Sequence, residues 1–166
     1  MAATYEIIAT TTLGSAASSI VFSSISGSYT DLILISAPKT QGNSYSFNIV
    51  LNSDTGTNYS CTRLYGSGTS AASDRSSSTA NSLGNWNVDT STGVVQPIIT
   101  QIQNYSNTTT YKTFLTRINS PAPDTYVGAV VSLWRSTSAI TSVEFKTSAN
   151  VGSGSTFTLY GIKAGS

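Results

Sequence analysis

The stretch SYSFNIVLNSDTGTNYSCTRLY, residues 44–65, decides the fold class. Apolar side chains recur at every second position in residues 44–51, and in residues 59–65 the set Tyr59, Cys61, Arg63 and Tyr65 alternates with Ser60, Thr62 and Leu64. A period of two is that of a β-strand with one buried face. Between the two runs, Asn52-Ser-Asp-Thr-Gly56 is rich in turn-forming residues. The stretch therefore predicts two antiparallel strands joined as a β-hairpin.

The same alternation recurs through the rest of the chain, whereas the apolar spacing of an amphipathic helix never persists over a helix length. Further strands are expected at 5–13, 19–25, 29–37, 83–88, 94–102, 111–118, 126–134, 140–147 and 156–162. The first two of these are expected to pair as a hairpin. The pattern predicts an all-β, single-domain antiparallel β-sandwich over residues 1–166, with a jelly roll of about eight to ten principal strands as the preferred topology.

Three expectations concern the place of single strands. In 29–37 the apolar residues Leu32 to Ile35 are contiguous, which indicates a strand in the middle of a sheet with both faces covered. The nearly uncharged run 126–134 predicts a second central strand. Pro97 has no backbone donor for a ladder, so 94–102 is expected at a sheet edge or at a bulge. Residues 66–81, rich in Ser and Gly, predict an exposed, mobile loop.

Composition argues against an enzyme. The chain has no histidine, one cysteine and seven dispersed carboxylates, whereas acid–base and metal chemistry near neutral pH rely on His, paired carboxylates or Cys clusters. Residues 52–56 resemble the start of a calcium loop, but the later bidentate acid is missing. We therefore expect no catalytic residue, no cofactor and no metal ligand. Cys61 lies on an expected strand and is interpreted as a structural thiol.

The charge pattern bears on partners and location. The net charge is +1 and the Lys and Arg residues are dispersed, which argues against a nucleic-acid partner. No apolar stretch approaches the ~20 residues of a membrane span, and residues 1–12 do not have the basic and apolar regions of a signal peptide. The sequence predicts a soluble product made in the cytoplasm, without membrane association.

Surface aromatic residues supply the candidate contacts. Trp86, Trp134 and Tyr65 could form a platform that stacks on sugar rings, although Trp134, at the end of a central strand, is equally read as a core residue. Tyr5 and Arg135 are added as candidate contact residues. A surface rich in Tyr, Ser, Asn and Gly also suits protein contacts, including homo-oligomerisation.

Four stretches carry a resemblance to a known family: MAATYEIIATTTL (1–13), SYTDLIL (28–34), NSDTGTNYS (52–60) and FTLYGIK (157–163). Together they resemble the small virion structural proteins of tailed bacteriophages and cyanophages. This resemblance spans the chain from end to end. It implies a jelly-roll capsid decoration (cement) protein, made in the host cytoplasm, that binds the major capsid protein on the capsid exterior, as a homotrimer, and stabilises the shell. The alternative that it implies is a receptor- or glycan-binding module of a tail or head fibre.

Overall fold

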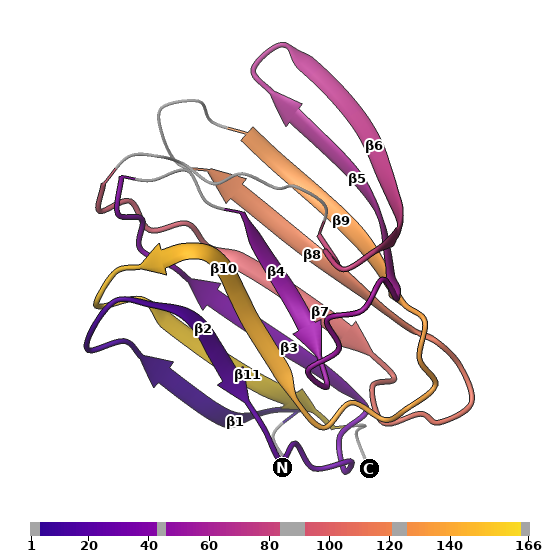
Figure 1. Ribbon diagram of the computed structural model, residues 1–166. Helices are drawn as coiled ribbons and strands as arrows, with labels where there is room; N and C mark the ends of the chain where they lie inside the picture. Colours follow the sequence, from indigo (N-terminus) through magenta and orange to yellow (C-terminus); the bar gives the residue numbers. More distant parts are fainter. Residues whose placement is uncertain (1–3, 43–45, 84–91, 121–125, 164–166) are drawn as a thin grey trace.

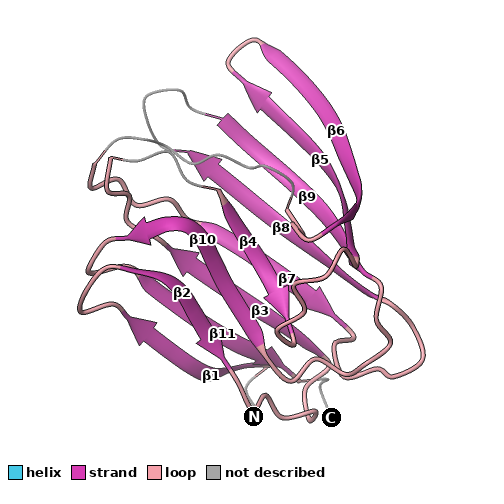
Figure 2. Cartoon of the chain, viewed as in Figure 1, coloured by secondary structure: helices cyan, strands magenta, loops and turns pink. Residues whose placement is uncertain are grey.

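The computed structural model describes residues 4–42, 46–83, 92–120 and 126–163, and in this part of the chain it contains strands and no helix (Figures 1 and 2). The strands are β1 (Tyr5–Thr12), β2 (Ala17–Phe22), β3 (Asp31–Ala37), β4 (Phe47–Leu51), β5 (Tyr59–Ser67), β6 (Ser70–Thr79), β7 (Ile98–Gln103), β8 (Lys112–Ser120), β9 (Tyr126–Trp134), β10 (Val143–Val151) and β11 (Thr156–Ile162). Among the described residues, no helix has the length and apolar character needed to cross a bilayer.

The strands form two antiparallel sheets of unequal size. The large sheet has eight strands in the order β1-β11-β3-β7-β8-β9-β5-β6, and the small sheet has three in the order β2-β10-β4. This arrangement confirms the predicted all-β sandwich. The preferred jelly-roll topology is not confirmed by an eight-plus-three division of the strands.

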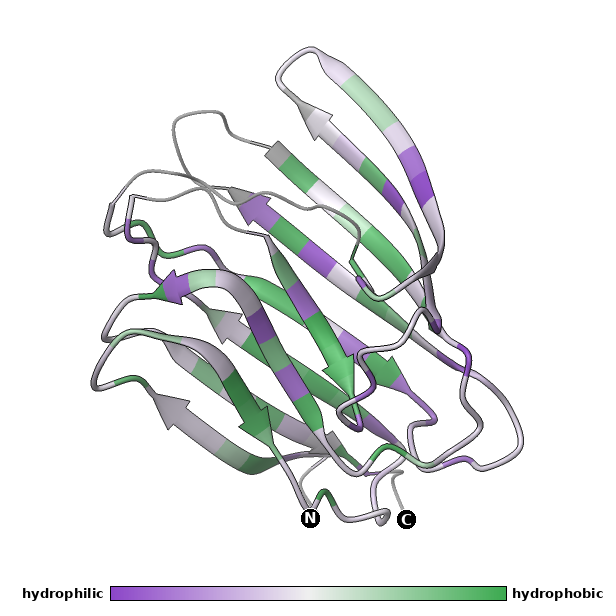
Figure 3. Cartoon of the chain, viewed as in Figure 1, coloured by the Kyte–Doolittle hydropathy of each residue, from purple (hydrophilic) through white to green (hydrophobic). Residues whose placement is uncertain are grey.

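The core lies between the two sheets. Phe145 of β10 stacks on Phe47 of β4 at a centroid distance of 5.7 Å and meets Phe157 of β11 at 5.0 Å, so one aromatic cluster joins the small sheet to the large one. Along β8, hydrophobic and hydrophilic residues alternate, whereas β9 shows almost no hydrophilic residue (Figure 3). Burial of alternate residues on each inner face supplies the main driving force for folding.

The predicted hairpin of residues 44–51 and 59–65 is wrong. β4 pairs with β10 in the small sheet, while β5 pairs with β9 and β6 in the large sheet. The connection between them crosses from one sheet to the other, and the hydroxyl of Tyr59 spans it by accepting from the Leu51 N–H at 3.0 Å and donating to the Asp54 carbonyl at 3.1 Å. Alternation identifies which residues face the core, but two strands that share a core can lie opposite each other instead of side by side.

The predicted hairpin at the N-terminus is wrong for the same reason. β1 pairs with β11 at one edge of the large sheet, and β2 pairs with β10 in the small sheet. Both partners come from the other end of the chain, more than a hundred residues away in sequence. A local pattern carries no information about such long-range pairing.

Residues 66–81 are not the expected loop, because most of them form β6. β5 and β6 are joined by Gly68 and Thr69 alone, and Gly68 has a φ of 59°, as a two-residue hairpin turn requires. The expected exposure is correct for most of β6, since it is an edge strand held by its ladder to β5. The tip of this hairpin extends away from the small sheet (Figure 1).

The central positions of two strands are confirmed. β3 lies between β11 and β7, and β9 lies between β8 and β5. The expected cover on both faces of β3 is absent, because Leu32 and Leu34 are buried while Ile35 is exposed. The edge position expected from Pro97 is also wrong, since β7 is an interior strand and Pro97 precedes its first residue. Most of the expected strand at 83–88 lies outside the described residues.

Candidate functional site

The large sheet has one face that no other part of the described chain covers. We call the side turned away from the small sheet the outer face. Register pairs place Leu64 of β5, Ala129 of β9, Arg117 of β8 and Ile99 of β7 in one row across it. Val131 belongs to the neighbouring row and is 55% exposed, whereas Val130, one residue earlier on the same strand, is fully buried. The outer face therefore exposes several apolar side chains to solvent among polar ones.

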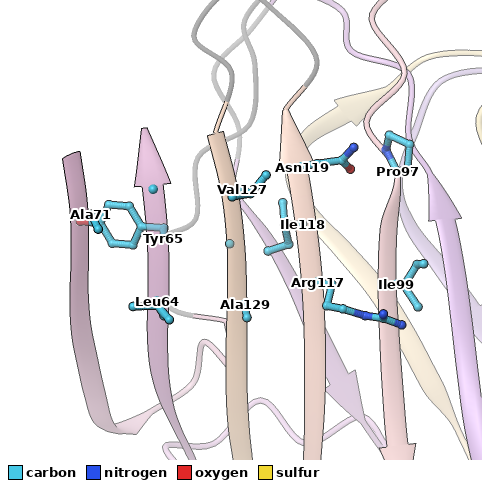
Figure 4. A pocket seen from close by; sticks show the side chains of 12 residues that line it. Leu64, Tyr65, Ala71, Pro97, Ile99, Arg117, Ile118, Asn119, Val127 and Ala129 are labelled. Carbon is cyan, nitrogen blue, oxygen red and sulfur yellow. The ribbon is translucent and has the colours of Figure 1, made fainter. Parts of the chain in front are cut away.

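A groove runs along this row. It has a volume of about 760 Å³ and lies between β5, β8 and β9, with contributions from β6 and β7. Figure 4 shows Leu64, Val127 and Ala129 along the groove, with the side chain of Arg117 extending from β8 toward Ile99. Val127 is 66% exposed. The groove thus presents aliphatic side chains and one guanidinium group.

A second, smaller depression of about 220 Å³ lies over β5, β6, β8 and β9. Its lining includes Thr62, Val131 and Arg75. Register pairs place Arg75 opposite Thr62 and Thr62 opposite Val131, so this depression follows the row next to that of Arg117. Each of these two depressions is therefore lined by one arginine.

These two arginines are the free charges of the outer face. Within the described residues, neither Arg75 nor Arg117 makes a hydrogen bond or an ion pair. Every described carboxylate, by contrast, already accepts a hydrogen bond from within the chain. The pairs are Glu6 with Lys163, Asp31 with the Asn104 N–H, Asp54 with Trp134, Asp74 with Arg63, and Glu144 with Ser19. The outer face thus carries unpaired positive charge without a counter-charge of its own.

Trp134 lies in the core and not on a binding platform. Its side chain is 2% exposed, and its indole N–H donates to the carboxylate of Asp54 at 2.7 Å. The reading of Trp134 as a core residue is confirmed, and a stacking role for it is wrong, because no sugar can reach the ring.

Residues 52–56, which resemble the start of a calcium loop, support this contact of Asp54 with Trp134 instead of binding a metal ion. The Asp54 carboxylate also accepts from the Gly56 N–H at 2.9 Å and from the Asn58 side-chain amide at 2.9 Å. Burial by itself raises the pKa of Asp54, but the bonds from Trp134, Asn58 and Gly56 outweigh it and hold the pKa below 3.8. Asp54 is therefore a structural carboxylate that ties the turn to the end of β9.

The other candidate residues are not brought together. Arg135 follows Trp134 and donates to the Tyr59 carbonyl at 3.3 Å and to the Ser60 hydroxyl, so it is engaged within the chain. Tyr5 is 57% exposed on the edge strand β1, near the opposite end of the large sheet from β5. Tyr65 lines the groove. Trp86 lies outside the described residues.

Sequence reasoning missed the residues of the outer face. A signal was present in β9, where apolar residues occupy positions on both faces of the strand. Val127, Ala129 and Val131 lie on one face, and Val130 and Trp134 lie on the other. A strand with one wetted face is expected to carry polar residues there. The role of Arg117 and Arg75 had no sequence signal, because their lack of an internal partner depends on the fold.

Among the described residues, no group of three or more His, Cys, Asp or Glu side chains could hold a metal ion. Cys61 is buried and unpaired, and burial raises the pKa of its thiol. No protein-family model matches the chain, and no curated protein matches it significantly.

Proposed function

We propose that the chain is a structural protein of a tailed-bacteriophage virion that binds the outer surface of the capsid shell, as a trimer, and stabilises it. The observation that carries this proposal is the exposure of apolar side chains on the outer face in the part of the chain that the structure describes, above all Leu64, Val127 and Val131. Large exposed apolar patches on folded proteins mark interaction surfaces. The resemblance of residues 1–13, 28–34, 52–60 and 157–163 to small phage virion proteins supplies the class of assembly.

Stabilisation of a shell follows from mass action. A protein that binds the assembled lattice, and not the free subunits, lowers the free energy of the assembled state by an amount that grows with its concentration and affinity. A chain that buries part of its outer face against neighbouring capsid subunits would add interface area to the shell. No chemistry beyond binding is required.

The alternative, a glycan-binding module of a fibre, has less support from the geometry. Trp134 is buried, and Tyr65 is the aromatic candidate that lines the groove. The side chains at the centre of the groove are aliphatic, whereas sugar platforms use exposed flat aromatic rings.

The experiment that tests the proposal locates and counts the chain in virions. Cryo-electron microscopy should place it over the head, and quantitative mass spectrometry should find it in a fixed ratio to the major capsid protein. Particles that lack the chain should lose DNA at a lower temperature than complete particles. A location at the tail tip, a few copies per virion, or unchanged heat resistance of the particles would each overturn the proposal.

A further inference from the structure

The sequence and the single-chain structure disagree about one face of the large sheet. Strands that are covered on both sides typically carry apolar residues on both faces. β3 has contiguous apolar residues, and β9 has apolar residues on both of its faces. In the described chain, only the inner side is covered, since Val130 is buried and Val131 is exposed. Among the described residues, no segment covers Leu64, Val127 and Val131, which are each more than half exposed, and a partner molecule would supply such cover.

The size of the face suits a protein partner. The five strands from β7 to β6 are six to ten residues long. At a strand spacing of about 4.8 Å and a rise of ~3.3 Å per residue, they give a surface on the order of 700 Å². Side chains that project from the sheet add to this area. A stable protein interface buries about 800 Å² on each partner, so the outer face supplies most of the area that one partner needs.

The charges of the face indicate the chemistry of the partner. Arg75 and Arg117 are exposed, have no partner within the described residues and lie about 15 Å apart by strand spacing and register. The described outer residues of β5, β6, β7, β8 and β9 include no carboxylate. Burial of an unpaired guanidinium in an apolar interface is costly, so the occupant must bring acceptors to these two positions.

A second copy of this chain does not meet that requirement. Face-to-face docking of two copies would bring four arginines together, and the described carboxylates are already engaged within each chain. Like charges in a desolvated interface oppose association. A nucleic acid is not favoured either, because two separated cations amid aliphatic side chains neutralise few phosphates.

We infer that the outer face of β5, β6, β7, β8 and β9 is the docking surface for a protein that presents two carboxylate-bearing positions within an apolar patch. Arg117 in the groove and Arg75 in the smaller depression each donate hydrogen bonds to one carboxylate of the partner, and the aliphatic residues between them supply the buried area. This inference rests on the proposed function, under which the partner is the capsid shell.

The test uses shells prepared without the chain and the full-length purified protein. Arg117→Glu and Arg75→Glu should each weaken binding at least about tenfold, because each reversal sets a carboxylate against a carboxylate. Lys146→Glu makes the same change of charge on an exposed residue of β10 in the small sheet and should leave binding within about twofold. Circular dichroism and the melting temperature should be unchanged in all three variants, since the three side chains are exposed.

A cross-linking arm tests the carboxylates directly. Arg117→Lys and Arg75→Lys place an amine at each position, and a carbodiimide should join it to an Asp or Glu of the shell protein, as identified by peptide mass spectrometry. Cross-links confined to Lys39 or Lys146 would overturn the inference.

The outcomes separate the inference from the proposed function. If the wild-type protein does not bind shells, the proposed function fails. If the wild-type protein binds and Arg117→Glu and Arg75→Glu bind equally well, the function stands and this docking surface is wrong. If the wild-type protein forms a dimer that Arg117→Glu abolishes, the occupant is a second copy, and the assignment of an acidic partner is overturned.

Discussion

The indole N–H of Trp134 and the carboxylate of Asp54 form a 2.7 Å hydrogen bond between residues 80 positions apart in the chain. The bond joins the turn after β4 to the end of β9, and so links the small sheet to the large one. Because Trp134 is only 2% exposed, this bond gives its indole N–H the acceptor that water cannot supply.

Replacement of Asp54 should therefore destabilise the fold. Asp54→Ala leaves the Trp134 N–H without its acceptor and is expected to lower the free energy of unfolding by about 1 to 3 kcal/mol. Asp54→Asn keeps an oxygen acceptor and should cost less. Urea unfolding followed by circular dichroism measures both, and equal stability of Asp54→Ala and the wild-type protein would contradict the role given to this bond.

The same residue predicts a pH dependence. Because the pKa of Asp54 is lowered from 3.8 on folding, the unfolded chain binds more protons than the folded chain in acid. The stability that Asp54 contributes is present above a pH of about 4 and is lost as the pH falls through the folded-state pKa. In urea titrations from pH 7 downward, the difference between the wild-type protein and Asp54→Ala should shrink in this acid range; a constant difference would count against the assignment.

Burial of Gly161 against Tyr29 predicts a steric limit. A Cβ on Gly161 would overlap the ring of Tyr29, which packs against this point of β11. Gly161→Ala should therefore cost about 1 to 3 kcal/mol of stability through overpacking. Gly14→Ala is the matched control, since a Cβ there meets nothing within 4 Å and its φ is not positive. Thermal unfolding should show a lower midpoint for the first variant alone.

Adjacent valines of β9 test the assignment of the two faces. Val130→Ala removes buried methyl groups and should cost about 1 to 3 kcal/mol, whereas Val131→Ala should change stability by no more than about 0.5 kcal/mol. Strand propensity changes equally in both variants, so the difference reports burial alone. Similar losses of stability in Val130→Ala and Val131→Ala would mean that the outer face is covered within the chain. The inferred docking surface would then be wrong.

Binding to shells should be nearly independent of pH from about pH 5 to 9. The chain has no histidine, and the thiol of Cys61 is buried with a raised pKa, so no described contact group titrates in this range. Carboxylates of the partner titrate below this pH range. Affinity measured across these pH values should vary little, and a sharp loss near pH 6 would contradict the prediction.

Local periodicity was enough to predict the fold class and the position of most strands. The period of two in residues 47–51, 59–67 and 156–162 is a local property of the chain, because successive side chains of any strand point to opposite faces. The central positions of β3 and β9 followed from their apolar content. The core place of Trp134 was one of two readings that the sequence left open.

Which strands are neighbours could be read from the three-dimensional arrangement and not from the local pattern. β4 and β5 pack on the same core but do not hydrogen-bond to each other, because they lie in different sheets. β1 pairs with β11 from the far end of the chain, since strand pairing depends on contacts that are remote in sequence. The strand character of β6 came from its ladder to β5 and not from its own composition. For the same reason the outer face and its unpaired Arg75 and Arg117 could not be found in the sequence: a charge is known to lack a partner only when its neighbours in space are known.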